Sequence, residues 1–204
     1  MVKKILLGAL IVLFSSVSLC AANSGDLQSA NQMPDFAKTA KFTADYYINT
    51  LQLEGHIEGG YFKELYKNSQ TVLANKSDEK RALSSTIYYL LKSGGVSKFH
   101  KLKSDEIWFF HDGSPLLIHM IDSAGVLRSV KLGLDVANGQ LPQVLVPAGT
   151  IFGAEVAEKD SFGLVSCMVS PGFDYKDFQL CSYQELAEKY PKYLDLIKRL
   201  SAAK

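Results

Sequence analysis

Short β-rich stretches, each closed by a turn signal, follow one another through most of this sequence. They are rich in β-branched and aromatic residues, and clusters of Gly, Pro, Asn or Asp separate them. No stretch with helical spacing interrupts them, which is typical of an antiparallel sandwich or barrel. The sequence therefore predicts an all-β domain with about ten strands: Tyr61–Tyr66, Ser84–Leu91, Ser97–Leu102, Glu106–His111, Leu116–Ile121, Val126–Leu132, Gln143–Val146, Ile151–Val156, Gly163–Val169 and Phe178–Leu180.

Helices are expected only at the two ends of this domain. Apolar residues recur at helical spacing over Asp35–Leu53, which predicts an amphipathic helix. Near the C-terminus, Ser182 and Glu185 form the pattern of a capping box. Pro191 then begins a second helical segment that runs to Leu200. The fold class is therefore a single β-barrel with short N- and C-terminal helices.

The N-terminus has the anatomy of a secretory signal. Lys3 and Lys4 precede an apolar run, and small residues up to Ala22 offer a cleavage site. The run is shorter than the roughly 20 apolar residues that span a bilayer. We expect a signal peptide over residues 1–22, a flexible tether over 23–34, the folded domain over 35–204, and export to the periplasm or secretion. The alternatives are lipid modification at Cys20 and a retained N-terminal anchor.

The charge balance excludes one class of partner. The 204 residues carry a net charge of +1, and loss of the two leader lysines would make it −1. A nucleic-acid surface needs a basic excess to displace phosphate counterions. We therefore expect no nucleic-acid partner, and no membrane partner once the leader is cleaved.

Two cysteines, Cys167 and Cys181, would remain in the exported chain. Spacing alone does not place them within bridging range, so a disulfide is the alternative. The apolar run around Cys167 favours a buried free thiol.

The chemistry-bearing residues gather between residues 94 and 113. His100 closes one predicted strand and Glu106 opens the next, so a short hairpin points an imidazole and a carboxylate into the same interior. Such a pair suits two roles: two ligands of a metal ion, or a catalytic base with the group that orients it. Trp108 and Phe110 share the strand parity of Glu106 and should face the same way.

These residues resemble the sequence motifs of the cupin superfamily. The first motif is matched by four residues at the family's spacings: Gly94, His100, Glu106 and Gly113. The run Pro147–Gly149 matches the second motif. Four blocks look more narrowly like one cupin branch that is grouped near the deoxysugar epimerases: residues 56–64, 105–113, 147–149 and 170–173. The resemblance implies a jelly-roll β-barrel with a pocket inside it.

Two metal-ligand positions of the cupin motifs hold apolar residues in this sequence. The resemblance implies three histidines and one glutamate, but Leu102 and Phe152 stand in place of two histidines. His100 and Glu106 alone would make a weak metal site. We therefore expect no cofactor, with a divalent metal at these two residues as the alternative. Three other side chains offer replacement donors: His56, Glu58 and His119.

The ligand site is expected inside the barrel. His100 and Glu106 are the catalytic candidates, and the ligand-binding candidates are Tyr61, Glu58, Leu102, Trp108, Phe110, His119 and Phe152. Each has a structural alternative: a mutually bonded His100–Glu106 pair, an aromatic core, a satisfied core histidine at 119, and a solvated turn carboxylate at 58. One of Tyr88 and Tyr89 must face inward, where a phenol opposite His100 would complete an acid–base pair.

Two function classes follow. The first is an exported cupin that binds a small, partly apolar ligand, for which a carbohydrate derivative is one option. If this protein is an enzyme, the resemblance favours isomerase- or epimerase-like proton transfer. The second class is a non-catalytic binding or structural barrel, with a weakly metal-dependent cupin as a third option. Exposed strand edges and aromatic residues such as Phe109 favour a homodimer.

Overall fold

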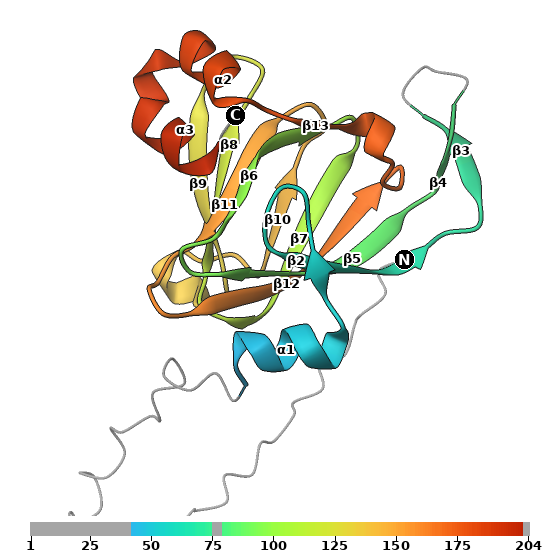
Figure 1. Cartoon of the computed structure of the whole chain (residues 1–204). Helices are drawn as coiled ribbons and strands as arrows, with labels where there is room; N and C mark the ends of the chain where they lie inside the picture. Colours follow the sequence, from blue (N-terminus) through green and yellow to red (C-terminus); the bar gives the residue numbers. More distant parts are fainter. Residues whose placement is uncertain (1–41, 75–78, 202–204) are drawn as a thin grey trace, which may run out of the picture. The chain divides into compact units, whose positions relative to one another are not determined.

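Two antiparallel sheets packed face to face form the domain (Figure 1). The computed structural model describes residues 42–74 and 79–201. Within these residues the strands form a six-stranded sheet, a five-stranded sheet and a two-stranded hairpin. The first runs in the order β1 (Glu54–Gly55), β2 (Tyr61–Lys67), β5 (Ser85–Lys92), β12 (Phe162–Ser170), β7 (Asp105–Gly113) and β10 (Gln143–Val146). The second runs β13 (Phe178–Leu180), β6 (Val96–Leu102), β11 (Ile151–Val156), β8 (Leu116–Ile121) and β9 (Leu127–Leu132). The all-β jelly-roll prediction is confirmed.

The strand predictions hold to within one or two residues. Four strands have the predicted bounds unchanged: β8, β10, β11 and β13. The sequence pattern misses β1 and the hairpin strands β3 (Thr71–Leu73) and β4 (Lys80–Ala82). Each of these has only two or three residues, too few to show the period of two that marks a strand.

The N-terminal helix is shorter than predicted. α1 spans Ala44–Leu51, whereas the apolar spacing predicts a helix over residues 35–53. The Thr43 hydroxyl accepts a hydrogen bond from the Tyr46 backbone N–H at 3.1 Å and caps the helix, so the helix begins after Thr43. Residues 35–41 lie outside the described residues, as do the predicted signal peptide and tether. The expected export therefore stays a prediction.

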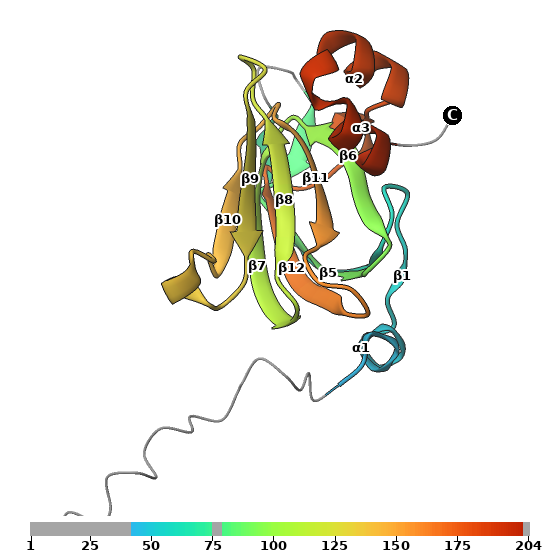
Figure 2. The same ribbon diagram turned by 90° about the vertical axis from the view of Figure 1, so that its left-hand side faces the viewer.

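The C-terminal helices form as predicted and lie against the outer face of the five-stranded sheet (Figure 2). The capping box of Ser182 and Glu185 begins α2 (Tyr183–Lys189), and Pro191 opens a 3₁₀ turn that leads into α3 (Leu194–Leu200). No helix in the described part of the chain has the length and apolarity needed to cross a membrane. The buried side chains of this layer include Phe99, Ile121, Leu186, Ile197 and Leu200.

The core between the sheets fills only part of the space that they enclose. Its buried members come from both sheets and include Tyr89, Trp108, Ile118, Phe152 and Val165. Strand alternation directs Glu106 and Trp108 of β7 inward, and both are buried. The end of the sandwich near Glu106 holds the cavity described below.

Cys167 and Cys181 are buried free thiols. Cys167 belongs to the core between the sheets, whereas Cys181 lies under the C-terminal helices. The disulfide alternative is therefore wrong, and the prediction of a buried thiol is confirmed.

The outer face of the six-stranded sheet carries a row of apolar side chains. The register aligns Leu145 with Ile107 and Met168, and beyond Thr86 of β5 the row ends at Tyr66. Leu145 and Tyr66 are each about half exposed.

We expect the predicted homodimer to use this face, because burying such a row favours association. Light scattering should give the mass of two chains and Leu145→Glu that of one; a monomeric wild-type mass contradicts the prediction.

Candidate functional site

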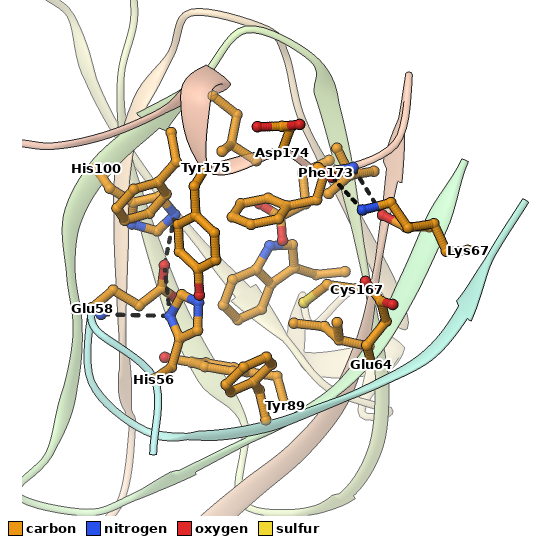
Figure 3. Close-up of a pocket in the computed structure, with 18 of the residues that line it drawn as sticks. His56, Glu58, Glu64, Lys67, Tyr89, His100, Cys167, Phe173, Asp174 and Tyr175 are labelled. Carbon is orange, nitrogen blue, oxygen red and sulfur yellow. Dashed lines mark hydrogen bonds and ion pairs between the residues drawn. The ribbon is translucent and has the colours of Figure 1, made fainter. Parts of the chain in front are cut away.

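A cavity of about 450 Å³ lies between the sheets, near the turn at residues 103–104 that joins β6 to β7. The hairpin predicted there is wrong, because β6 and β7 belong to different sheets and do not pair. It is bounded by strands of both sheets, by the turn before β2 and by the segment from residue 173 to residue 178 (Figure 3). Its wall is mostly apolar and includes Phe62, Ile87, Leu102, Trp108, Val169 and Phe178. Buried polar groups face it as well: His56, Glu58, His100 and Glu106.

Glu58 is fixed in the turn before β2 by backbone and side-chain contacts. The Lys98 backbone N–H donates to the Glu58 carbonyl at 2.9 Å. The Ser97 hydroxyl donates to Glu58 Oε1 at 2.8 Å, and His100 Nε2 lies 3.2 Å from Glu58 Oε2. β6 therefore supplies a partner to each oxygen of this carboxylate.

His100 and Glu58 form a close pair at the cavity. His100 Nδ1 lies 2.7 Å from the Lys98 carbonyl, which only accepts hydrogen bonds, so Nδ1 carries a hydrogen. His100 Nε2 lies 3.2 Å from Glu58 Oε2, so the imidazole and the carboxyl group face each other at the cavity. Imidazole and carboxyl groups are the side chains that most often donate and accept protons in catalysis.

His56 stands beside this pair as a neutral ring. The Glu58 backbone N–H donates to His56 Nδ1 at 3.4 Å, which leaves the ring hydrogen on Nε2. Burial lowers the pKa of His56, the Glu58 carboxylate opposes this shift, and His100 adds to it. Glu58 Oε2 lies 3.5 Å from Nδ1. Because Nδ1 is an acceptor, that approach is not an ion pair.

Glu106 is a carboxyl group held in its neutral form. Burial raises its pKa to about 8, and the negative charge of Glu58 contributes to the shift. The thiol of Cys167 and the indole N–H of Trp108 lie beside the carboxyl and partly offset the shift. The geometry of the indole N–H is nevertheless too poor for a hydrogen bond, and among the described residues it has no partner. Below about pH 8, Glu106 is therefore an O–H donor with an unused N–H next to it.

Tyr89 is the inward-facing tyrosine, but its hydroxyl is already engaged. It donates to the Gly59 carbonyl at 2.8 Å, which ties β5 to the turn that carries Glu58. Burial raises the pKa of Tyr89 well above its ordinary value, and the Glu58 charge adds to this. Tyr89 is thus a structural donor, and Glu106 is the more acidic group at the cavity.

Five of the predicted site residues line the cavity: Glu58, His100, Leu102, Glu106 and Trp108. His100 and Glu106 do not form the mutually bonded pair that the hairpin suggested. Both ring nitrogens of His100 instead face Lys98 and Glu58.

The four other predicted residues lie outside the lining. Tyr61 packs in the cluster under α1. Phe110 packs against the core beyond Trp108, where a register shift interrupts the pairing of β7 with β12. Phe152 packs at a tilt against the His100 ring, with the ring centres 4.1 Å apart. His119 faces the outer side of the five-stranded sheet, where it contacts Ser129 and Glu155.

The sequence reasoning missed the aromatic segment that covers one side of the cavity. Phe173 and Tyr175 meet edge to face with their ring centres 5.0 Å apart, and both lie near Phe178. Arg81 of β4 anchors the segment, because its guanidinium donates to both oxygens of Asp177 at 2.6 and 3.1 Å. The only sequence signal is the aromatic residues that follow Pro171-Gly172, and their partner strand β4 was not predicted.

The residues present do not fit the metal site that the cupin motifs imply. The side chains of Leu102 and Phe152 have no donor atoms, and the ring nitrogens of His100 already face the Lys98 carbonyl and Glu58. No group of three or more His, Cys, Asp or Glu side chains within residues 42–74 and 79–201 is arranged to hold a metal ion. His119, a predicted replacement donor, lies on the opposite face of its sheet.

Comparison with known proteins gives consistent matches. The family described as Cupin superfamily (DUF985) matches residues 45–181. The uncharacterized protein YML079W of Saccharomyces cerevisiae is 33% identical over 143 residues, which cover 64% of this chain and 71% of that protein. A hypothetical protein from Leishmania major has a TM-score of 0.75 and 38% identity, covering 79% of this chain and 100% of its own. Protein SO0799 from Shewanella oneidensis has a TM-score of 0.74 and 43% identity, covering 80% of this chain and 99% of its own. This chain therefore belongs to the cupin superfamily, in the family DUF985.

Proposed function

We propose that this cupin binds a small, partly apolar molecule in the cavity of its barrel. The observation that carries the proposal is a cavity of about 450 Å³ with an aromatic and aliphatic wall and buried polar groups at its inner end. Small-molecule sites typically have volumes of roughly 300–1,000 Å³ and combine such walls with a few placed polar groups. A barrel filled by its own side chains would leave no such space.

The single tryptophan of the sequence makes this proposal testable. Trp108 lines the cavity, so a bound molecule should change its fluorescence. We expect native mass spectrometry of the purified protein to identify a co-purifying small molecule. Its return to ligand-free protein should change the emission saturably in the wild type and not in Trp108→Phe. A protein that carries no small molecule, and whose emission no member of a metabolite library changes, contradicts the proposal.

Isomerase- or epimerase-like proton transfer is a second candidate. One observation favours it: the Glu58–His100 pair, whose nearest atoms lie 3.2 Å apart, faces the same cavity as the protonated carboxyl of Glu106. Two groups that differ in their protonation at one pH are the pattern of an acid and a base in catalysis. Such a reaction needs no redox partner, because protons are only moved.

Substitutions at Glu58 distinguish its contribution to stability from its contribution to proton transfer. In Glu58→Gln the amide oxygen can accept from Ser97 and the amide N–H can donate to His100 Nε2, so we expect a loss of less than about 1 kcal/mol in the free energy of unfolding. Glu58→Ala leaves both partners buried and unpaired, and should lose about 1–3 kcal/mol. Denaturant unfolding measures both.

If the protein catalyses proton transfer, both Glu58 variants should lose activity. Glu58→Gln and Glu58→Ala should each slow proton exchange in the identified ligand by about 100-fold or more. Wild-type exchange rates in Glu58→Gln contradict the catalytic candidate and leave ligand binding standing.

A further inference from the structure

The rim of the cavity does not suit an anionic ligand. Lys67 is the one lysine or arginine among the lining residues that the structure describes. It is exposed, and its ammonium donates to the Phe173 carbonyl at 3.2 Å (Figure 3). Three acidic residues share the lining with it: Glu54, Glu64 and Asp174. Phosphates and carboxylates are held by clusters of Arg and Lys, so an anion would meet repulsion here without a free cationic partner.

The inner end does not suit a cation either. The Glu58 carboxylate is already bonded to Ser97 and paired with His100. Glu106 is neutral below about pH 8, so it offers no negative charge. A cationic group there would lose its hydration without gaining an unpaired carboxylate. The interior therefore favours an uncharged ligand.

Two hydrogen-bond donors stand side by side at that end. Glu106 and Trp108 lie two residues apart on β7 and face the same way, and both line the cavity. The Trp108 indole N–H has no partner within the described residues. A buried polar group without a partner costs free energy comparable to a lost hydrogen bond, so it marks a place where an acceptor is missing. A carbonyl oxygen has two lone pairs and can accept from both donors.

We propose that the ligand is an uncharged carbonyl compound with an apolar body, whose oxygen is received by Glu106 and Trp108 at the inner end of the cavity. This inference rests on the proposed function and names its class of ligand. The aromatic wall formed by Phe62, Phe173 and Phe178 would hold the apolar body.

The donor at Glu106 gives this recognition a pH limit. The titratable groups that act on the carboxyl are Glu58 from the turn before β2 and Cys167 from β12. Three further titratable groups line the same cavity: His56, Tyr89 from β5 and His100 from β6. Loss of the Glu106 proton near pH 8 turns a donor into an acceptor that repels a carbonyl oxygen. Binding should therefore hold below that pH and weaken above it.

Three ring compounds of the same size test the charge selection: cyclohexanone, cyclohexanecarboxylate and cyclohexylammonium. In ¹⁵N-labelled full-length protein the single tryptophan gives one indole N–H resonance, which reports directly on the site. We expect cyclohexanone to shift this resonance with a Kd on the order of millimolar, which suits so small a ligand. The two charged rings should bind at least about tenfold more weakly.

Two substitutions of Glu106 test the donor. Glu106→Leu removes it and should weaken cyclohexanone binding by about fivefold or more. Glu106→Gln keeps an N–H donor and should remove the loss of binding above pH 8. The wild-type pH series stands independently if either variant folds poorly.

Each contrary result has a distinct meaning. Tighter binding of the carboxylate or the ammonium overturns the inference and leaves the proposed function standing. Cyclohexanone binding that is unchanged in Glu106→Leu, or unchanged above pH 8 in the wild type, also overturns it. If none of the rings shifts the indole resonance, the inference fails, and native mass spectrometry alone then decides the proposed function.

Discussion

Glu106→Gln is expected to abolish a loss of stability that the wild-type protein undergoes between about pH 4.5 and pH 8. The unfolded chain releases the Glu106 proton near the ordinary pKa of 4.5, whereas the folded protein holds it to about pH 8. Between these values the folded state binds one more proton, so raising the pH favours unfolding. The stability from this proton is fully present below pH 4.5 and is lost as the pH rises through 8. Its size is on the order of 3–5 kcal/mol.

Denaturant unfolding of the wild type and two variants at a series of pH values measures this effect. Glu106→Gln should gain stability relative to the wild type with each step from pH 5 to pH 8. Glu64→Gln serves as the control, because Glu64 is exposed on the rim and solvated in both states; it should follow the wild type. The lowered pKa of His56 acts with the opposite sign and costs stability as the pH falls. All three proteins retain His56, so its effect cancels. Parallel curves for wild type and Glu106→Gln contradict the prediction.

The sequence predicts the barrel and the inward direction of Glu106 because both depend on local alternation. In β7 a period of two is enough to send Glu106 and Trp108 to the same face. The same rule fails in β8, where His119 lies in a run that is apolar on both faces. The outer face of that sheet is covered by α3, whose Arg199 bonds Glu155 beside His119, so burial there does not distinguish inside from outside.

The partner of His100 could not be predicted from spacing. A predicted hairpin suggested Glu106, but β6 and β7 lie in different sheets, and the structure brings Glu58 to His100 from the turn before β2. Which turn closes over a barrel depends on long-range packing, such as the Lys98–Glu58 backbone bond and the Tyr89–Gly59 bond. The position of the aromatic segment around Phe173 was not predicted for the same reason, because Arg81 holds the segment from a hairpin that is remote in sequence.

Gly59→Ala should be among the most damaging small changes in this protein. Gly59 has a φ of +113°, a region that residues with a Cβ rarely adopt, and a Cβ built there would lie 2.1 Å from the Val96 carbonyl oxygen. The clashing atom belongs to the backbone of β6, so it cannot rotate away as a side-chain atom could. We expect a loss of more than about 2 kcal/mol in the free energy of unfolding. Gly55→Ala is the matched control, because nothing lies within 4 Å of its Cβ position.

The same substitution links the backbone to the chemistry of the cavity. The Gly59 carbonyl accepts from Tyr89, and the neighbouring Glu58 carboxylate meets His100 at 3.2 Å, so a displaced turn moves the acid–base pair as well. Gly59→Ala should therefore weaken the ligand-induced change in Trp108 emission about tenfold or more even where the variant remains folded. Gly55→Ala, with an unfolding free energy within about 0.5 kcal/mol of wild type, should retain the full response. Equal stability and equal response in the two variants would contradict this prediction. The turn before β2 would then accommodate a Cβ without cost, and Gly59 would not hold Glu58 in place.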